Sequence, residues 1–294
     1  MTDQNRGEEG QPGALDLGNV WNRGLTLLRE NAQLIAIVAG VFVLLPNAAL
    51  QFALPADADM EQPLQALVNP NASDAMRQKA ALALGEMLKP FFLLSAASLV
   101  IAHIGYAAIV ALIGRARPTV GEGLAQALRV VLPLMLALII TIVGAYAVLL
   151  LIQLVLMPIG PAAGVFLGSI IGLLTFFYIT ARLALTLPVM VIEWQLNPLK
   201  ALIRSWRLTA GNARVVFGFW MLMGVAWFVT MILQASFAGG LASVAGTGPT
   251  ASLIQGLIGG AFSMVWGALY CAMGVSMHTA LRGPMAEDVA SQFD

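Results

Sequence analysis

The residues best suited to bind a charged ligand lie in the stretch LIRSWRLTAGN, residues 202–212. Arg204, Trp206 and Arg207 fall within this stretch, in a chain of which only 10% of the residues are charged. Arginine side chains match the oxygen atoms of a phosphate group with two parallel hydrogen bonds. Together with Lys200, they predict a site for phosphate or lipid headgroups. The alternative is a helix that lies on the membrane surface and needs no specific ligand.

Four other ionisable residues lie in or beside apolar runs: His103, His278, Arg182 and Glu193. A histidine inside a membrane span is either a proton relay or a packing residue that is hydrogen-bonded to a neighbouring helix. A straight helix would hold Arg182 and Glu193 about 16 Å apart, too far for contact. Glu193 must therefore fold back at a break near Pro188, or pair with a basic residue of the next helix.

No arrangement of residues is typical of an enzyme. The sequence has no HExxH, CxxC, Walker or dinucleotide-binding motif, and no carboxylates cluster within an apolar run. Asp57, Asp59 and Glu61 are regularly spaced, but they lack the further ligands and the glycine of a calcium-binding loop. We therefore expect a non-enzymatic protein without catalytic residues, metal or cofactor.

The composition indicates an integral membrane protein. The 294 residues are 59% hydrophobic and have a mean hydropathy of +0.85. Soluble domains are about 45–50% apolar, so much of this apolar surface must face lipid. The net charge is zero, which argues against a nucleic-acid partner. The expected partners are membrane lipids, anionic ones included, and a second copy or another protein.

Six apolar stretches are long enough to cross a bilayer, which takes about 20 residues. They are residues 34–54, 91–113, 130–157, 164–188, 215–237 and 251–281. The sequence therefore predicts an all-α fold, a polytopic integral membrane helix bundle with six transmembrane helices in one domain, residues 15–283. Residues 1–14 are expected to be a disordered polar tail, and residues 284–294 a cytoplasmic tail.

The basic residues predict the orientation of these spans. If the spans alternate, twelve of the 15 lysines and arginines lie on the side of the N-terminus and three lie on the other side. Short cytoplasmic loops are rich in lysine and arginine. We therefore expect both termini in the cytoplasm and the protein in the bacterial inner membrane.

A short amphipathic helix is predicted on the cytoplasmic side before spans 1, 3 and 5. Asp16 can cap the first helix, and Thr119 with Glu122 forms a capping box for the second. The first and third also share the pattern R-x3-L-x3-N, at residues 23–31 and 204–212. These features indicate three units, each an interfacial helix followed by a two-helix hairpin.

The third amphipathic helix contains the basic stretch. Asn197 can cap it, Pro198 suits its first position, and Gly211 suits the residue just past its end. Its two faces follow from helical spacing. The apolar face is Leu199, Leu202, Ile203 and Trp206, and the basic face is Lys200, Arg204 and Arg207.

Glycines at four-residue spacing predict close helix packing. One set is Gly160, Gly164, Gly168 and Gly172, and a second is Gly256 and Gly260. Small residues on one face let two helices approach closely. The partner is another helix of the same chain, a second copy of the protein, or a lipid in a groove.

The segment LPVMVIEWQLNPLKALIRSWRLTAGNARVVFGF resembles the glycerophosphoryl diester phosphodiesterase membrane-domain family. The matching residues are Pro188, Glu193, Ser205, Trp206, Leu208, Thr209 and Gly211. The likeness covers most of residues 15–283, but its specific letters lie in 182–218. In some members of the family this domain is fused to a soluble phosphodiesterase barrel, which takes about 250 residues. The longest predicted loop, 55–90, has no room for one.

Three functions remain open from the sequence. The first is a non-enzymatic membrane protein that binds or organises lipids or partner proteins. The second is a transporter or flippase for a lipid or small amphiphile, although the apolar spans offer few polar groups. The third is a membrane-lipid phosphodiesterase, for which the sequence lacks a nucleophile, a base and metal ligands.

Overall fold

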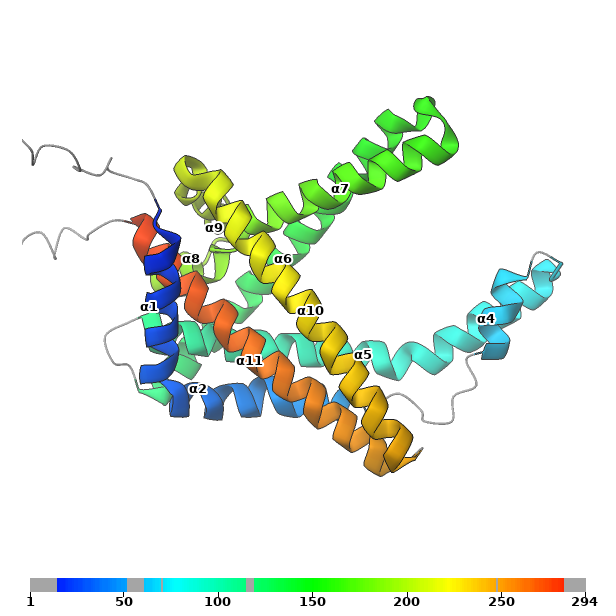
Figure 1. Cartoon of the computed structure of the whole chain (residues 1–294), viewed down its shortest axis with the longest axis horizontal. Coiled ribbons are helices and arrows are strands. Elements are labelled where there is room, and N and C mark those ends of the chain that lie inside the picture. The colour runs from blue at the N-terminus through cyan, green and yellow to red at the C-terminus, as the bar shows by residue number, and fades with distance from the viewer. Residues whose placement is uncertain (1–14, 52–60, 70, 115–118, 247, 283–294) are drawn as a thin grey trace, which may run out of the picture. The chain divides into compact units, whose positions relative to one another are not determined.

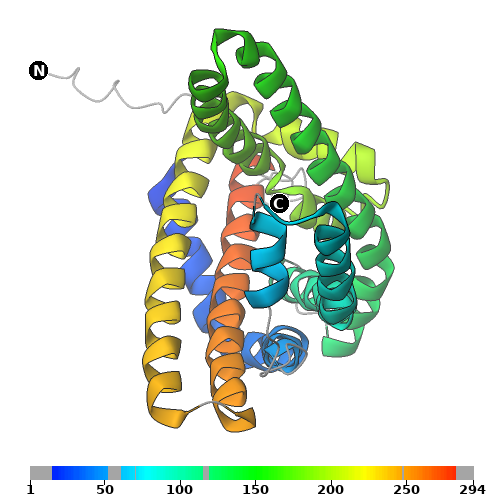
Figure 2. The same ribbon diagram turned by 90° about the vertical axis from the view of Figure 1, so that its right-hand side faces the viewer.

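The computed structural model describes residues 15–51, 61–69, 71–114, 119–246 and 248–282. Over these residues the protein is all-helical, with 92% of residues in helices and no strand. Figures 1 and 2 show the helices from two directions. The predicted all-α class is therefore confirmed. The predicted tails, 1–14 and 284–294, lie outside the described residues, as do Asp57 and Asp59.

Eleven α-helices make up the described chain. In order they are α1 (Leu17–Glu30), α2 (Ala32–Ala39), α3 (Leu45–Gln51), α4 (Glu61–Val68), α5 (Asp74–Gly114), α6 (Val120–Leu156), α7 (Pro161–Leu183), α8 (Thr186–Ile192), α9 (Pro198–Leu208), α10 (Ala213–Ala245) and α11 (Pro249–Arg282). A π-helical turn, Gly40–Leu44, joins α2 to α3.

Within the described ranges, six helical segments are long and apolar enough to cross a membrane, one at each predicted span. They are Ala32–Leu50, Asp74–Gly114, Val120–Ile159, Ala162–Ile192, Ala210–Leu241 and Thr250–Arg282. The prediction of a multi-pass membrane protein with six spanning helices is confirmed at this level.

Two local predictions were wrong. Residues 55–90 are not all loop, because α4 and the first turns of α5 are helical; Ser73 accepts a hydrogen bond from the N–H of Met76 at the start of α5. The amphipathic segment before span 3 is not a separate helix. It forms the first turns of α6, since no proline separates the capping box at Thr119 and Glu122 from the start of the apolar run at Val130.

The described helices form two compact units. The first unit comprises Met1–Ala32, Ala107–Trp227 and Leu269–Asp294. In it, α6 and α7 run side by side in both views, coloured green (Figures 1 and 2). The end of α11 packs beside α1, where a β-carbon on Gly24 would lie 2.6 Å from Sδ of Met273.

The predicted glycine stripe faces α6. A β-carbon at Gly164 would collide with the carbonyl oxygen of Leu156, and one at Gly172 would lie 2.8 Å from the side chain of Leu149. A β-carbon at Gly168 would lie 2.5 Å from the side-chain oxygen of Gln153. Gly160 has a φ of 130°, precedes the first residue of α7 as its N-cap, and has nothing within 4 Å of its β-carbon position. In the described chain, the partner of this stripe is therefore the neighbouring helix.

The second unit comprises Gln33–Tyr106 and Phe228–Ala268. The π-helical turn precedes Pro46, which cannot donate a backbone hydrogen bond. Gly260 packs against this turn, since its β-carbon would lie 2.7 Å from the carbonyl oxygen of Leu44; Gly256 is also buried. His103 lies 2.7 Å from the Leu99 carbonyl oxygen through Nδ1, and its ring meets that of Tyr106 edge-on.

The close packing of α6 on α7 predicts the effect of a single methyl group. Gly164→Ala should destabilise the protein by about 1–3 kcal/mol, because the rigid backbone of α6 cannot move aside. A thermal unfolding curve in detergent measures this loss. Gly144→Ala on α6 is the matched control, since nothing lies within 4 Å of its β-carbon position. Equal melting temperatures for the two variants would contradict the packing.

Candidate functional site

The candidate site is built around a break between α7 and α8 in the first unit. Helix α7 ends at Leu183 and helix α8 starts at Thr186. Pro188 has no N–H, so it leaves the Ala184 carbonyl without its helical donor. The hydroxyl of Tyr270 donates to this carbonyl at 3.3 Å. The hydroxyl of Thr186 donates to the carbonyl of Leu183 at 2.6 Å. Side chains thus replace the hydrogen bonds that the break removes.

Helix α9 docks on the same break through small residues. The hydroxyl of Ser205 donates to the carbonyl of Arg182 at 2.9 Å, and that of Thr209 does so at 3.4 Å. Ala201, Ser205 and Thr209 are spaced four apart, and all three are 0% exposed. Because hydroxyls are small, the two backbones can approach closely and still satisfy the freed carbonyl.

The side chain of Arg182 is enclosed by α7 and α9. The guanidinium lies 4.3 Å from the centre of the Trp206 ring. Its Nη1 donates to the Tyr178 hydroxyl at 3.1 Å, and its Nη2 donates to the Trp206 carbonyl at 2.6 Å. Arg182 is 4% exposed and lies at the C-terminal ends of two helices, whose dipoles stabilise a positive charge. It therefore joins α9 to α7 as a structural residue.

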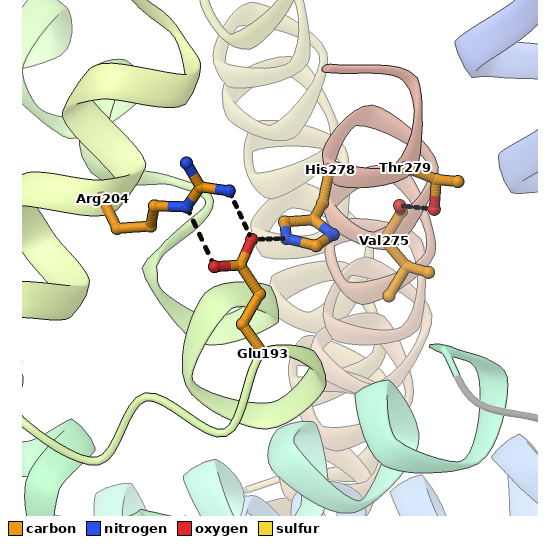
Figure 3. A network of polar contacts seen from close by, with 5 residues as sticks. All are labelled: Glu193, Arg204, Val275, His278 and Thr279. Atoms are coloured by element: carbon orange, nitrogen blue, oxygen red, sulfur yellow. Dashed lines mark hydrogen bonds and ion pairs between the residues drawn. The ribbon is translucent and has the colours of Figure 1, made fainter. Parts of the chain in front are cut away.

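Glu193 joins the ends of three helices. Its carboxylate accepts two hydrogen bonds from Arg204, at 2.9 and 3.2 Å, and lies 3.0 Å from Nε2 of His278. Figure 3 shows Arg204 and His278 on opposite sides of this carboxylate. Glu193 follows α8, Arg204 belongs to α9 and His278 to α11. Of the two geometries expected for Glu193, pairing with the following helix is the one observed.

The surroundings of Glu193 favour its ionised form. Partial burial raises the pKa of the carboxyl, but the hydrogen bonds and charges of Arg204 and His278 outweigh this effect and hold the pKa below its ordinary value. The carboxylate is therefore ionised at neutral pH, and two arginine hydrogen bonds can persist there. Because the guanidinium of Arg204 is already hydrogen-bonded to Glu193, it is less able to bind a ligand than Lys200 and Arg207, the other cations of α9.

Helix α9 presents three different faces, because each residue advances about 100° around the helix axis. The small residues Ala201, Ser205 and Thr209 face the protein. Three large apolar residues of α9 are exposed: Leu199 by 56%, Ile203 by 50% and Trp206 by 39%. Leu202, on the same face, and Leu208 are half-buried. The third face carries Lys200, Arg204 and Arg207. The apolar and basic faces are predicted by the sequence, but the small-residue face is not.

Only the N-terminal end of α9 matches the sequence prediction. Asn197 caps the helix by accepting a hydrogen bond from the N–H of Lys200 at 3.0 Å, and Pro198 is the first helical residue. The prediction for the C-terminal end was wrong. The helix ends at Leu208, and the hydroxyl of Thr209 bonds back to the carbonyls of Ser205 and Trp206 at this end. Gly211 lies in the 3-10 turn that follows.

Helix α1 makes a related set of contacts in the same unit. Asp16 caps it as predicted, accepting from the N–H of Gly18 at 2.8 Å. The hydroxyl of Ser276 donates to the carbonyl of Val20 at 2.8 Å, as Ser205 does to Arg182. The amide of Leu15 donates to the side chain of Asn212 at 3.0 Å. Asn212 ends the repeated pattern found in the sequence, and here it connects α1 to the turn after α9.

Several residues of the site were not recognised from the sequence. Tyr270 and Gln126 donate hydrogen bonds to carbonyl oxygens of the α7–α8 segment. Tyr270 donates to the carbonyl of Ala184 at 3.3 Å, and Gln126 donates to that of Val191 at 2.6 Å. Both are single polar residues in apolar helices, and their spacing carries no signal. His278 was predicted to be either a proton relay or a packing histidine, but its partner, Glu193, could not be named from the sequence. His103 belongs to the second unit and is not part of this site. No group of three metal-binding side chains occurs within the described ranges.

The junction of three helices at Glu193 predicts a loss of stability on neutralisation. Glu193→Gln should destabilise the protein by about 1–2 kcal/mol, because the amide cannot accept both bonds from Arg204 and a contact with His278. The apparent melting temperature in detergent should fall by several degrees. Glu30→Gln, at an exposed carboxylate, is the control. An unchanged melting temperature for Glu193→Gln would contradict the structural role of the carboxylate.

The lowered pKa of Glu193 also predicts a pH dependence. A carboxyl whose pKa is lower in the folded state than in the unfolded state stabilises the folded state at pH values above its unfolded-state pKa. This contribution is lost as the pH falls through the folded-state pKa. The difference in melting temperature between the natural protein and Glu193→Gln should therefore shrink below about pH 4. A difference that grows on acidification would show that the carboxylate is not stabilised in the fold.

Comparison with known proteins leaves this geometry to stand alone. No family model matches the chain, and neither the curated proteins nor the solved structures that were searched contain a match. The resemblance to the glycerophosphoryl diester phosphodiesterase membrane-domain family therefore stays a prediction. A function has to be argued from the contacts around α9.

Proposed function

We propose that this chain is a non-enzymatic multi-pass protein of the bacterial inner membrane that binds anionic lipid headgroups through α9. Both termini would lie in the cytoplasm, and α9 would lie at the cytoplasmic surface of the bilayer. The proposal includes membership of the glycerophosphoryl diester phosphodiesterase membrane-domain family, as a membrane domain alone. Lipids are the expected partners, and protein partners could assemble on the same surface.

The observation that carries this proposal is the division of α9 into three faces. The small-residue face is bound to the protein, so the other two faces are left for the surroundings. One exposes Leu199, Ile203 and Trp206, and the other carries exposed Lys200 and Arg207. A helix with a basic face and an apolar face that includes tryptophan is typical of the boundary between headgroups and acyl chains.

The charge of the first unit also supports an anionic partner. Its described residues include nine cationic and four acidic side chains. The cationic ones are Arg23, Arg29, Arg129, Arg182, Lys200, Arg204, Arg207, Arg214 and Arg282, and the acidic ones are Asp16, Glu30, Glu122 and Glu193. Each basic side chain near an anionic leaflet contributes about 1 kcal/mol of attraction.

A transporter or flippase for a lipid or amphiphile is the second candidate, and the break between α7 and α8 favours it. Discontinuous helices often line transporter sites. Here, however, protein side chains bind the carbonyls of Arg182, Leu183 and Ala184. Lipid flux in reconstituted vesicles, lost on changing Arg182 or His103, would favour transport over binding.

Removal of the two exposed cations of α9 tests the proposed function. The variant Lys200→Gln/Arg207→Gln leaves the Arg204–Glu193 pair intact. Loss of about 2 kcal/mol of attraction predicts a roughly 30-fold weaker binding of anionic lipid. Mass spectrometry of the lipids that remain after gentle detergent extraction, with phosphatidylglycerol compared with phosphatidylethanolamine, measures this change.

The matched control for this experiment is Lys79→Gln/Lys89→Gln, which removes two exposed lysines from α5. It changes the net charge of the protein equally, but it leaves α9 untouched. We expect the control to retain anionic lipid as the natural protein does. Equal retention by the control and by the α9 variant would overturn the proposal.

A further inference from the structure

Trp194, in the link between α8 and α9, has an unusual backbone conformation. Its φ is 59°, and it is the one residue other than glycine with a positive φ within the described ranges. This left-handed region crowds the β-carbon of an L-residue, so glycine or asparagine normally occupies it. The position directly follows Glu193, where the chain reverses from α8 towards α9. The reversal requires a left-handed residue but does not require a tryptophan.

The side chain of Trp194 gives a reason for its presence. Trp194 is 40% exposed, although a large aromatic ring is normally stabilising when buried. Leu196, two residues on, is 37% exposed. The link therefore adds two exposed apolar side chains immediately before the apolar face of α9. Because five residues span at most about 17 Å, Trp194 lies close enough to Leu199 for both side chains to reach one surrounding layer.

The surroundings that fit these side chains are the interface of a lipid bilayer. Tryptophan is enriched at this interface, where its ring meets acyl chains and its N–H meets headgroups. The segment from Trp194 to Trp206 has an exposed tryptophan at each end and exposed Leu199 and Ile203 between them. It also belongs to the unit with the excess of cations. A soluble partner protein would bind the apolar residues without needing the basic face.

We propose that Trp194 is a membrane-inserted anchor that holds the start of α9 in the cytoplasmic monolayer of anionic phospholipid. The left-handed backbone at this position is tolerated because it presents an indole to lipid at the tight reversal after Glu193. This inference rests on the proposed function, because it takes α9 to lie on lipid headgroups. It adds a second point of attachment, which depends on apolar insertion and not on charge.

Depth-dependent fluorescence quenching tests the insertion. The one cysteine of the chain, Cys271, is buried, so a second cysteine can be labelled selectively. Trp194→Cys carries a fluorescent label in vesicles of equal parts phosphatidylglycerol and phosphatidylethanolamine. Lipids brominated near the upper acyl chain should quench it about twofold, since interfacial anchors lie about 5–10 Å into the boundary. Gln78→Cys, at an exposed residue of the polar start of α5, is the control and should not be quenched.

A second readout avoids dependence on the cysteine variant. The variant Trp194→Phe keeps an aromatic ring at this position. Brominated lipid should quench the total tryptophan fluorescence of this variant by a smaller fraction than that of the natural protein. A label at position 194 that is quenched no more than the control would overturn the inference, even where Lys200→Gln/Arg207→Gln loses anionic lipid. The expected twofold quenching at position 194, with anionic lipid retained by that double variant, would uphold insertion and overturn the proposed headgroup site.

Discussion

The structure of the first unit depends on one constraint: backbone carbonyls freed inside a membrane protein must find donors, because lipid offers none. The break between α7 and α8 frees such carbonyls at Arg182, Leu183 and Ala184. Their donors are the hydroxyls of Ser205, Thr186 and Tyr270. Two of these hydroxyls come from other helices. The need for hydrogen-bond donors at the break therefore also brings α9 and α11 together.

The docking of α9 then decides which of its residues remain available. Ser205 and Thr209 turn the small-residue face inward, and the bond between Arg204 and Glu193 fixes the rotation of the helix. As a result, Lys200 and Arg207 remain exposed, as do Leu199, Ile203 and Trp206. The same carboxylate contacts His278, so the end of α11 is connected to the orientation of α9. The packing of α9 against the protein and the exposure of its cations and large apolar residues are thus two consequences of one set of contacts.

The helical class, the six spans and the caps at Asp16, Thr119 and Asn197 could be predicted from the sequence. These features depend on local composition, or on residues three apart, which a single chain displays directly. The contacts of Glu193 with His278 and of Tyr270 with Ala184 could not be predicted. They join residues 85 and 86 positions apart, and no spacing rule links them. The left-handed backbone of Trp194 could not be predicted, because glycine and not tryptophan usually occupies such a position.

The small-residue face of α9 shows why amphipathic patterns alone were insufficient. The sequence divides α9 into an apolar face and a basic face, and the apolar face would ordinarily be assigned to the protein core. Instead, alanine, serine and threonine make the protein contact, because close approach and hydrogen bonding to a carbonyl matter more there than apolar area. The exposure of large apolar residues on α9 is what the proposed contact with lipid requires.

The central claim is that α9 is fixed to the helix break by its small residues and binds anionic headgroups with its exposed cations. A cryo-electron microscopy structure in nanodiscs that contain phosphatidylglycerol tests it most directly. The account predicts phosphate density within about 4 Å of Lys200 or Arg207, with the bond between Glu193 and Arg204 intact. An α9 that is detached from the Arg182 carbonyl, or an ordered α9 whose cations point away from the lipid, would contradict it.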